Sequence, residues 1–367
     1  MPDDAPLLPD YGGACVANLL PALLEPTEYP APWLPDAALD AQQVVLLVLD
    51  GMGWDQVQSR RSLVPTLSAM AGGPITTVLP STTSTALTSI TTGCGPGEHG
   101  IVGYRMAVHG EVLNVLRWAT GSGDARQSLP PAKMQVATPF LGERPPVVTR
   151  AEYERSGFTA VHLDPGRFVG YRTMATMSAE VERLLRSSEP FVYAYYDGLD
   201  KVAHEYGLGE HYDSELSWLD ILVDRILSRL PRHAALVVTA DHGQVEVLAP
   251  AIPLAADVMA NTSMQSGEGR FRWLHARPGR GRALHEACRA HHGDDAWVLT
   301  RDEMVAQGWF GPFVTESARA RLGDVALVAR RDVAFHDPQD TGPYSLIGRH
   351  GSATRAEMLV PLLVAGR

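Results

Sequence analysis

The chain has 367 residues, of which 45% are hydrophobic, 20% charged and 7% aromatic. This is the composition of a globular protein, and it excludes a disordered chain, a collagen-like repeat and a coiled coil. The formal net charge of -11 argues against wholesale binding to nucleic acid or to an anionic membrane. It does not exclude a phosphate-bearing substrate, because a bound divalent metal reverses the sign of a site locally.

The cysteines and the N-terminus bear on the cellular compartment. Cys15, Cys94 and Cys288 are far apart and form no CxxC pair, so we expect a reducing compartment and neither a disulfide framework nor a thiolate metal site. The chain begins with acidic residues, and its first apolar stretch, 17–24, is short and interrupted by Pro21, so we expect no signal peptide. No apolar run reaches the roughly 18 residues of a membrane-spanning helix. The predicted location is cytoplasmic.

Short apolar runs alternate with longer amphipathic segments along the chain. Runs rich in Val, Leu and aromatic residues predict buried strands at residues 44–49, 160–163, 191–196, 235–239 and 359–364. Helical periodicity covers 177–185 and 214–230. This alternation predicts an α/β fold, with a mostly parallel central sheet and helices on both faces.

Two segments do not follow this alternation of strands and helices. Residues 121–146 contain Pro and Gly and are weakly periodic, which predicts a long excursion. Within residues 260–344, strand patterns and helix patterns alternate: strands at 271–276, 296–299 and 325–329, and helices at 282–291 and 301–307. Because this block lies between the last two motifs of the main sheet, we expect a small inserted α+β cap of residues 260–344 on an α/β core of residues 1–259 and 345–367.

Two predicted strands are followed directly by candidate metal ligands. Asp50 follows strand 44–49, and Gly51 allows a tight exit from it. Asp241 and His242, in an Asp-His-Gly motif, follow strand 235–239. Ligands bind beyond the carboxyl ends of parallel strands, so these side chains are placed to hold a metal, although Asp50 could instead cap the next helix.

The segments after strand 191–196 and before strand 359–364 add further candidates. Asp200 and His204 are four residues apart, which places a carboxylate and an imidazole on one helix face and suits Zn²⁺ or a similar divalent metal. A surface ion pair is the alternative for this pair, and Asp197 is an alternative to Asp200. His350, next to Gly351, is a weaker candidate on a tight loop.

A cluster of hydroxyl groups precedes a predicted helix. The helix is predicted at residues 86–92, and the glycine that follows it is typical of a helix C-terminus. The hydroxyl groups directly before it belong to Ser81, Thr82, Thr83, Ser84 and Thr85. The N-terminus of such a helix suits an anion such as phosphate. A threonine here could be a nucleophile if its pKa is lowered, or it could be a simple helix cap.

Together these motifs supply carboxylates, imidazoles and a hydroxyl, which suit two divalent metal sites with mixed nitrogen and oxygen ligands. The candidate residues are Asp50, Thr83, Asp200, His204, Asp241, His242 and His350. The other histidines have no such context and are expected to be surface or core residues.

The motifs, in this order, resemble the alkaline phosphatase superfamily, and most closely its type I phosphodiesterase/nucleotide pyrophosphatase family. The resemblance extends over residues 44–364 and includes the segment Glu98-His99-Gly100-Ile101-Val102-Gly103. It implies an alkaline-phosphatase-like fold and a threonine nucleophile ten residues before Gly93, which is Thr83. It also implies two metal ions, most often Zn²⁺. One would be held by Asp200, His204 and His350, and the other by Asp50, Asp241, His242 and the Thr83 oxygen.

The implied function is that of a metal-dependent phosphoric ester hydrolase with a phosphothreonine intermediate. By this resemblance it would be a phosphodiesterase or nucleotide pyrophosphatase acting on a small phosphate ester or nucleotide-like substrate, with no nucleic-acid polymer or membrane as partner. A phosphomonoesterase, a phosphonate hydrolase and a phosphomutase of the same superfamily are alternatives, as are a catalytically silent binding protein and an interaction protein.

One position departs from the family pattern. The phosphodiesterases usually carry an asparagine three residues after the nucleophile, where this chain has Ala86. Metals, backbone N–H groups or another side chain would then stabilise the phosphoryl oxygens.

Overall fold

The computed structural model describes residues 5–340 and 345–366. Its central sheet has seven strands in the order β2-β17-β10-β1-β9-β7-β8. Their bounds are β1 Gln43–Leu49, β2 Ala71–Thr76, β7 Pro146–Arg150, β8 Arg167–Tyr171, β9 Phe191–Tyr196, β10 Ala234–Thr239 and β17 Leu359–Gly366. The five strands from β10 to β8 pair in parallel, whereas β17 runs antiparallel to both β10 and β2. The predicted mostly parallel sheet is confirmed.

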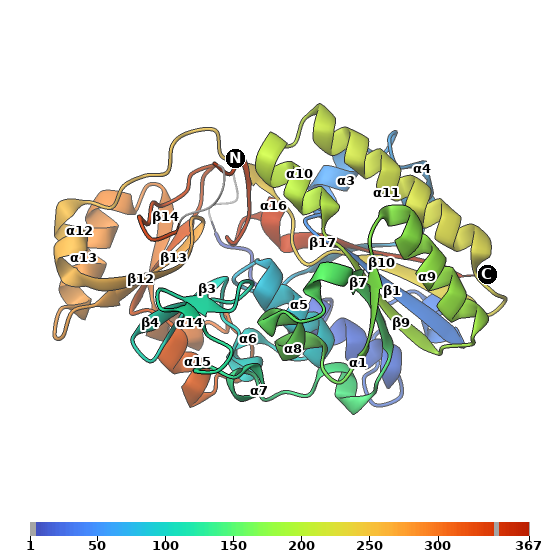
Figure 1. Cartoon of the computed structure of the whole chain (residues 1–367). Coiled ribbons are helices and arrows are strands. Elements are labelled where there is room, and N and C mark those ends of the chain that lie inside the picture. Colours follow the sequence, from blue (N-terminus) through green and yellow to red (C-terminus); the bar gives the residue numbers. More distant parts are fainter. Residues whose placement is uncertain (1–4, 341–344, 367) are drawn as a thin grey trace.

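Helices cover both faces of this sheet (Figure 1). Helices α9 (Met174–Arg186), α10 (Gly198–Tyr206) and α11 (Glu210–Arg229) lie on one face, and α1 (Leu19–Leu24), α5 (Thr83–Thr92) and α8 (Gly157–Leu163) on the other. Strands β9 and β10 are buried along their whole length, which explains their continuous apolar sequence. None of the helices in the described residues is long and apolar enough to span a bilayer.

A second, four-stranded antiparallel sheet lies beside the central one (Figure 1) and has the order β12-β13-β15-β14. Its elements are α12 Ala256–Asn261, β12 Thr262–Glu268, β13 Phe271–Ala276, α13 Gly281–His292, β14 Ala296–Thr300, α14 Arg301–Ala306, α15 Glu316–Arg321 and β15 Val325–Ala329. Val258, Leu274, Leu284 and Phe335 belong to a separate core on this sheet. The boundaries of the cap remain a prediction, and its last residue, Tyr344, lies outside the described residues.

One predicted strand is wrong. Residues 160–163 belong to α8, because the Ser156 hydroxyl accepts a hydrogen bond from the Thr159 N–H and starts a helix there. A four-residue apolar run does not by itself distinguish a strand from a buried helical turn.

The remaining elements are short. The excursion at 121–146 holds β6 (Gly123–Asp124), α7 (Pro131–Met134) and a 3-10 helix, η2 (Pro139–Gly142). A small hairpin sheet precedes it, with β3 Arg105–Val108, β4 Glu111–Asn114 and β5 Ala119–Thr120. The others are η1 Val16–Asn18, α2 Asp36–Leu39, α3 Trp54–Ser59, α4 Pro65–Ala69, α6 Pro96–His99, η3 Ala151–Tyr153, β11 Val245–Glu246, β16 Gly348–Arg349 and α16 Arg355–Met358.

Candidate active site

The carboxyl ends of three adjacent parallel strands meet at one edge of the sheet. Asp50 follows β1, Asp241 and His242 follow β10, and Asp200 and His204 lie on α10 directly after β9. The antiparallel strand β17 enters the sheet from this same edge, so the loop before it brings in His350. Thr83 is the first residue of α5. The fold therefore gathers all seven candidate residues in one place.

Asp50, Asp241 and His242 form one group beside Thr83. The Nε2 atom of His242 lies 3.3 Å from Asp50 Oδ1 and 3.5 Å from Asp241 Oδ2. The Thr83 hydroxyl is 3.3 Å from the same Nε2 atom. The three potential ligand atoms of the group lie within 4.8 Å of one another, which is close enough for a single ion to contact all of them.

Asp200 and His350 form a second group, in which His242 again takes part. His350 Nε2 lies 3.7 Å from Asp200 Oδ1, and His204 Nε2 lies 3.2 Å from Asp200 Oδ2. Asp197, the alternative to Asp200, belongs to neither group of potential ligand atoms: its carboxylate pairs with Arg150 and with Lys201 at 2.6 Å.

The backbone fixes the orientation of all three imidazoles. Each Nδ1 atom faces a carbonyl oxygen: His204 faces Gly348 at 2.7 Å, His242 faces Gly243 at 3.0 Å and His350 faces Ser81 at 3.0 Å. A carbonyl can only accept, so Nδ1 donates and Nε2 is directed toward the carboxylates. This second hydrogen bond is characteristic of metal-binding histidines.

The charges of the cluster are unbalanced without a cation. Burial, together with the nearby Asp241 and Asp200, raises the pKa of Asp50 well above its usual range, and burial also raises the pKa of Asp241. Burial by itself would lower the pKa of His242, but the surrounding carboxylates outweigh it and raise this pKa to about 10. Asp50 Oδ1 and Asp241 Oδ2 are buried without a hydrogen-bond partner. This donor set fits divalent cations, which would satisfy both orphaned oxygens.

Two residues that hold candidate ligands in place were not identified from the sequence. The Tyr195 hydroxyl donates to Asp50 Oδ2, and Gln244 Nε2 donates to Asp200 Oδ1 at 2.6 Å. Gln244 could have been suspected, because it directly follows the Asp-His-Gly motif. Tyr195 lies within a continuous apolar strand and carries no such signal.

The first turn of α5 offers backbone donors beside Thr83. The first hydrogen bond of the helix runs from the Ala86 N–H to the Thr82 carbonyl, so the N–H groups of residues 83–85 precede it and are available at the helix N-terminus. Ala86 itself is buried. Its methyl group offers no hydrogen bond to a group bound beside Thr83.

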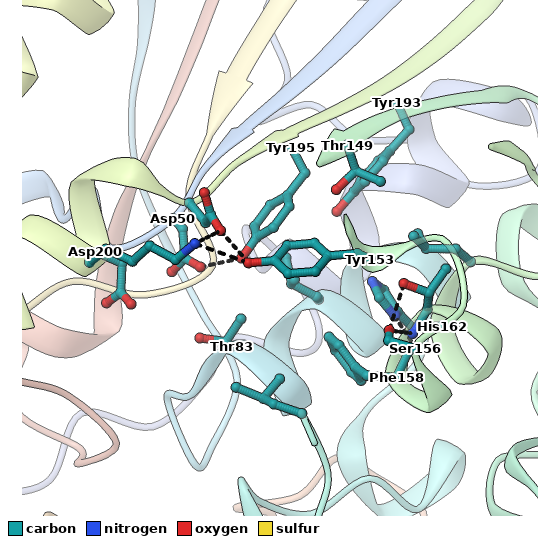
Figure 2. A pocket seen from close by; sticks show the side chains of 16 residues that line it. Asp50, Thr83, Thr149, Tyr153, Ser156, Phe158, His162, Tyr193, Tyr195 and Asp200 are labelled. Atoms are coloured by element: carbon teal, nitrogen blue, oxygen red, sulfur yellow. Dashed lines mark hydrogen bonds and ion pairs between the residues drawn. The ribbon is translucent and has the colours of Figure 1, made fainter. Parts of the chain in front are cut away.

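Thr83 lines two cavities. The smaller has a volume of about 170 Å³ and is also lined by Asp50 and Asp200 (Figure 2). Tyr153 and Phe158 also line it, and Phe158 stacks on the His162 ring with centroids 3.9 Å apart. The larger cavity, of about 540 Å³, extends past Asp200, His204 and His350 to the second sheet.

Solved structures with the same fold include enzymes that act on phosphorus compounds. Murine ectonucleotide pyrophosphatase/phosphodiesterase 5 matches at a TM-score of 0.67 and 16% identity, over 89% of this chain and 88% of that one. Its inactive threonine-to-alanine variant in complex with AMP matches at a TM-score of 0.66 and 16% identity over the same shares. Phosphonoacetate hydrolase from Sinorhizobium meliloti 1021, in complex with phosphonoformate, matches at 0.65 and 20% identity, over 89% and 90%. At these identities the likeness shows the fold alone.

Sequence comparison gives the family. No curated protein matches the chain. The family described as type I phosphodiesterase/nucleotide pyrophosphatase matches residues 44–353, which is most of the chain. The protein therefore belongs to the type I phosphodiesterase/nucleotide pyrophosphatase family of phosphoester hydrolases.

Proposed function

We propose that the protein is a metal-dependent phosphodiesterase or nucleotide pyrophosphatase that forms a phosphothreonine intermediate on Thr83. The observation that carries this proposal is the position of the Thr83 hydroxyl. It lies 3.3 Å from His242 Nε2, next to two buried carboxylates and at the N-terminus of α5. The AMP bound to the inactive threonine-to-alanine variant of the murine relative is consistent with this role and with a nucleotide-like substrate.

The candidate ligands divide between two metal ions. Asp200, His204 and His350 would hold one, and Asp50, Asp241, His242 and the Thr83 oxygen would hold the other. Nitrogen and oxygen donors without thiolate suit Zn²⁺. When bound, such ions act as Lewis acids that lower the pKa of a coordinated hydroxyl group and offset the charge of the phosphoryl group.

The chain's own groups carry out the displacement. Thr83 Oγ1 attacks phosphorus in line, and the bond from phosphorus to the leaving oxygen breaks with its electron pair on that oxygen. The N–H groups at the start of α5 bind the phosphoryl oxygens, where a donor side chain is missing at Ala86. Attack of water on the phosphothreonine then releases the phosphoryl product and restores the Thr83 hydroxyl.

Replacing Thr83 tests the proposal. Thr83→Ala is expected to lower the turnover of bis(p-nitrophenyl) phosphate by about 10³-fold or more, with metal content still near that of the wild type. Thr92→Ala, at the other end of α5, is the matched control. Acid-quenched wild-type enzyme should carry a phosphoryl group on the peptide that contains Thr83. If Thr83→Ala kept most of the activity, another nucleophile would have to be sought.

The fold shared with phosphonoacetate hydrolase favours a phosphonate hydrolase as the second candidate. Assays of phosphonoacetate, p-nitrophenyl phosphate and bis(p-nitrophenyl) phosphate under the same conditions distinguish the phosphonatase, the monoesterase and the diesterase.

A further inference from the structure

The three buried carboxylates of the site share a hydrogen-bonding pattern. In each of them a protein donor binds one oxygen and leaves the other oxygen facing an imidazole. Asp241 Oδ1 accepts the backbone N–H groups of Gly51 and His242, both at 3.1 Å. Its Oδ2 has no hydrogen-bond partner in the described chain and lies 3.5 Å from His242 Nε2. The backbone therefore orients this carboxylate before any cation binds.

Tyr195 supplies the donor for Asp50. Its hydroxyl donates to Asp50 Oδ2 (Figure 2). Asp50 Oδ1 has no hydrogen-bond partner among the described residues and lies 3.3 Å from His242 Nε2. Tyr195 is paired in the sheet with Val48, two residues before Asp50. The sheet thus fixes the donor and the carboxylate relative to each other.

Gln244 supplies the donor for Asp200. Its Nε2 donates to Asp200 Oδ1 at 2.6 Å, while Asp200 Oδ2 lies 3.2 Å from His204 Nε2. A carboxylate only accepts, so the amide nitrogen and not the amide oxygen faces Asp200. Gln244 is fully buried, and two glycines make room for it. A Cβ on Gly51 would lie 2.7 Å from Nε2, and one on Gly348 would lie 3.0 Å from Oε1.

The amide of Gln244 is unfavourable for the fold itself. Its Oε1 atom is buried and has no hydrogen-bond partner in the part of the chain that the structure describes. An unsatisfied buried acceptor destabilises a folded protein, so an apolar side chain of the same length would suit packing better. The amide instead directs a donor at a candidate ligand, which points to a role in the site.

We propose that Tyr195 and Gln244 are positioning residues that serve different metal sites. Tyr195 orients Asp50 for one ion, and Gln244 orients Asp200 for the other. The inference rests on the division of ligands in the proposed function. By binding one carboxylate oxygen, each donor directs the other oxygen at the ion and removes freedom that metal binding would otherwise have to restrict. Since the two donors contact different carboxylates, they act independently on metal affinity.

Zinc affinities of single variants test the proposal. Tyr195→Phe removes only the hydroxyl, and Gln244→Met keeps the length of the side chain without its donor. We expect each variant to raise one of two Zn²⁺ dissociation constants by about tenfold or more, measured against a competing chelator, and to leave the other within about twofold. The matched controls, Tyr212→Phe and Gln265→Met, should keep both constants. In the described chain the Tyr212 hydroxyl has no hydrogen-bond partner, and Gln265 Nε2 contacts Met259 Sδ, so neither holds a candidate ligand.

Variants that keep a single site assign each loss. In His204→Ala the ion held by Asp50 should remain, and Tyr195→Phe should weaken its binding while Gln244→Met does not. In Asp241→Asn the other ion should remain, and the two effects should be reversed. If either positioning variant weakened the remaining ion equally in both backgrounds, the proposal would be wrong.

Thermal unfolding separates positioning from a merely structural role. With chelator present, Gln244→Met should have a Tm close to that of the wild type, because the loss of its hydrogen bond is offset by the loss of the unpaired Oε1. With Zn²⁺ present, its Tm should be lower than that of the wild type. An equal fall in both conditions would show a structural role and overturn the proposal. If Gln244→Met did not fold, Tyr195→Phe in the two single-site backgrounds would decide.

These measurements require no turnover, so they are independent of the reaction. Site-specific losses of zinc affinity in a protein that hydrolyses no diester would support the positioning roles and reject the proposed function. Diester hydrolysis together with unchanged zinc affinities in Tyr195→Phe and Gln244→Met would reject the positioning roles and leave the proposed function standing.

Discussion

The imidazole rings of His242 and His350 lie stacked, with centroids 3.5 Å apart and an angle of 11° between their planes. His242 follows β10, and His350 lies on the loop before β17. His242 belongs to both groups of potential ligand atoms, whereas His204 contacts Asp200 alone among the carboxylates of the cluster. His242 therefore lies beside both candidate metal sites.

This shared position predicts unequal effects of histidine substitutions on metal content. We expect His204→Ala to lose about one bound metal per chain. His242→Ala should lose more, because its ligand atom belongs to one site and also lies within 4.8 Å of the Asp200 and His350 ligand atoms of the other site. Metal per chain, measured by elemental mass spectrometry after dialysis, checks this expectation. The exposed His211→Ala should keep the wild-type content. Equal losses in His204→Ala and His242→Ala would show that His242 supports only its own site.

The buried carboxylates predict that replacing Asp50 shifts the Tm in different directions with and without metal. Burial and the neighbouring carboxylates raise the pKa of Asp50, so the ionised form is unfavourable in the folded protein without metal. With chelator present, Asp50→Asn should keep or raise the Tm relative to wild type under the same conditions. With metal present, the same variant should have a lower Tm than wild type, because a ligand is lost. A variant that is less stable than wild type by the same amount in both conditions would contradict this explanation.

The sequence predicts this site better than it predicts the sheet around it. Asp50, Asp241 and His242 follow strands that are apolar on both faces, and such strands stand out in a sequence. Strands β2 and β8 lie at the two ends of the sheet and contain glycine, proline or arginine, so they carry no comparable pattern. Tyr195 could not be assigned from sequence, because its role depends on a contact between distant segments.

Buried histidines outside the site predict a loss of stability in acid. Burial and, to a lesser extent, Arg321 lower the pKa of His99 to about 3, and burial lowers that of His162 to about 4. His99 Nδ1 accepts from the Ile101 N–H, and its Nε2 faces the Ser89 hydroxyl at 2.9 Å, so the neutral ring is the form that fits.

The sign follows from these shifts. The unfolded chain takes up a proton on each histidine below a pH of about 6.5, while the folded protein does not until a pH of about 3 to 4. The two histidines therefore leave the free energy of unfolding unchanged above pH 6.5. They lower it as the pH falls below 6.5, by about 2 kcal/mol per histidine at pH 5. Urea unfolding between pH 7 and 5 should show a smaller decline in His99→Gln than in wild type. The control, His211→Gln, is expected to match the wild-type slope; an unchanged slope in His99→Gln would refute the assignment.

The buried ion pair between Arg270 and Glu357 predicts that the second sheet supports the His350 loop. Both side chains are fully buried, and Arg270 also donates to the carbonyls of Arg331 and Val333. Glu357 Oε1 accepts from the Ser352 N–H at 3.0 Å, two residues after His350. Arg270→Met leaves the carboxylate buried and unpaired, which should lower the free energy of unfolding by about 3–5 kcal/mol and weaken metal binding.

Two matched variants make this prediction specific. The double variant Arg270→Met/Glu357→Leu should recover part of the stability, because no unpaired charge remains in the interior. Arg355→Met breaks an exposed pair with Asp55 and should change the free energy of unfolding by less than about 1 kcal/mol. Urea unfolding and metal titration of the three proteins measure these differences. If Arg270→Met were no less stable than Arg355→Met, the pair would not hold the loop, and His350 would have to be positioned by its own hydrogen bond to the Ser81 carbonyl.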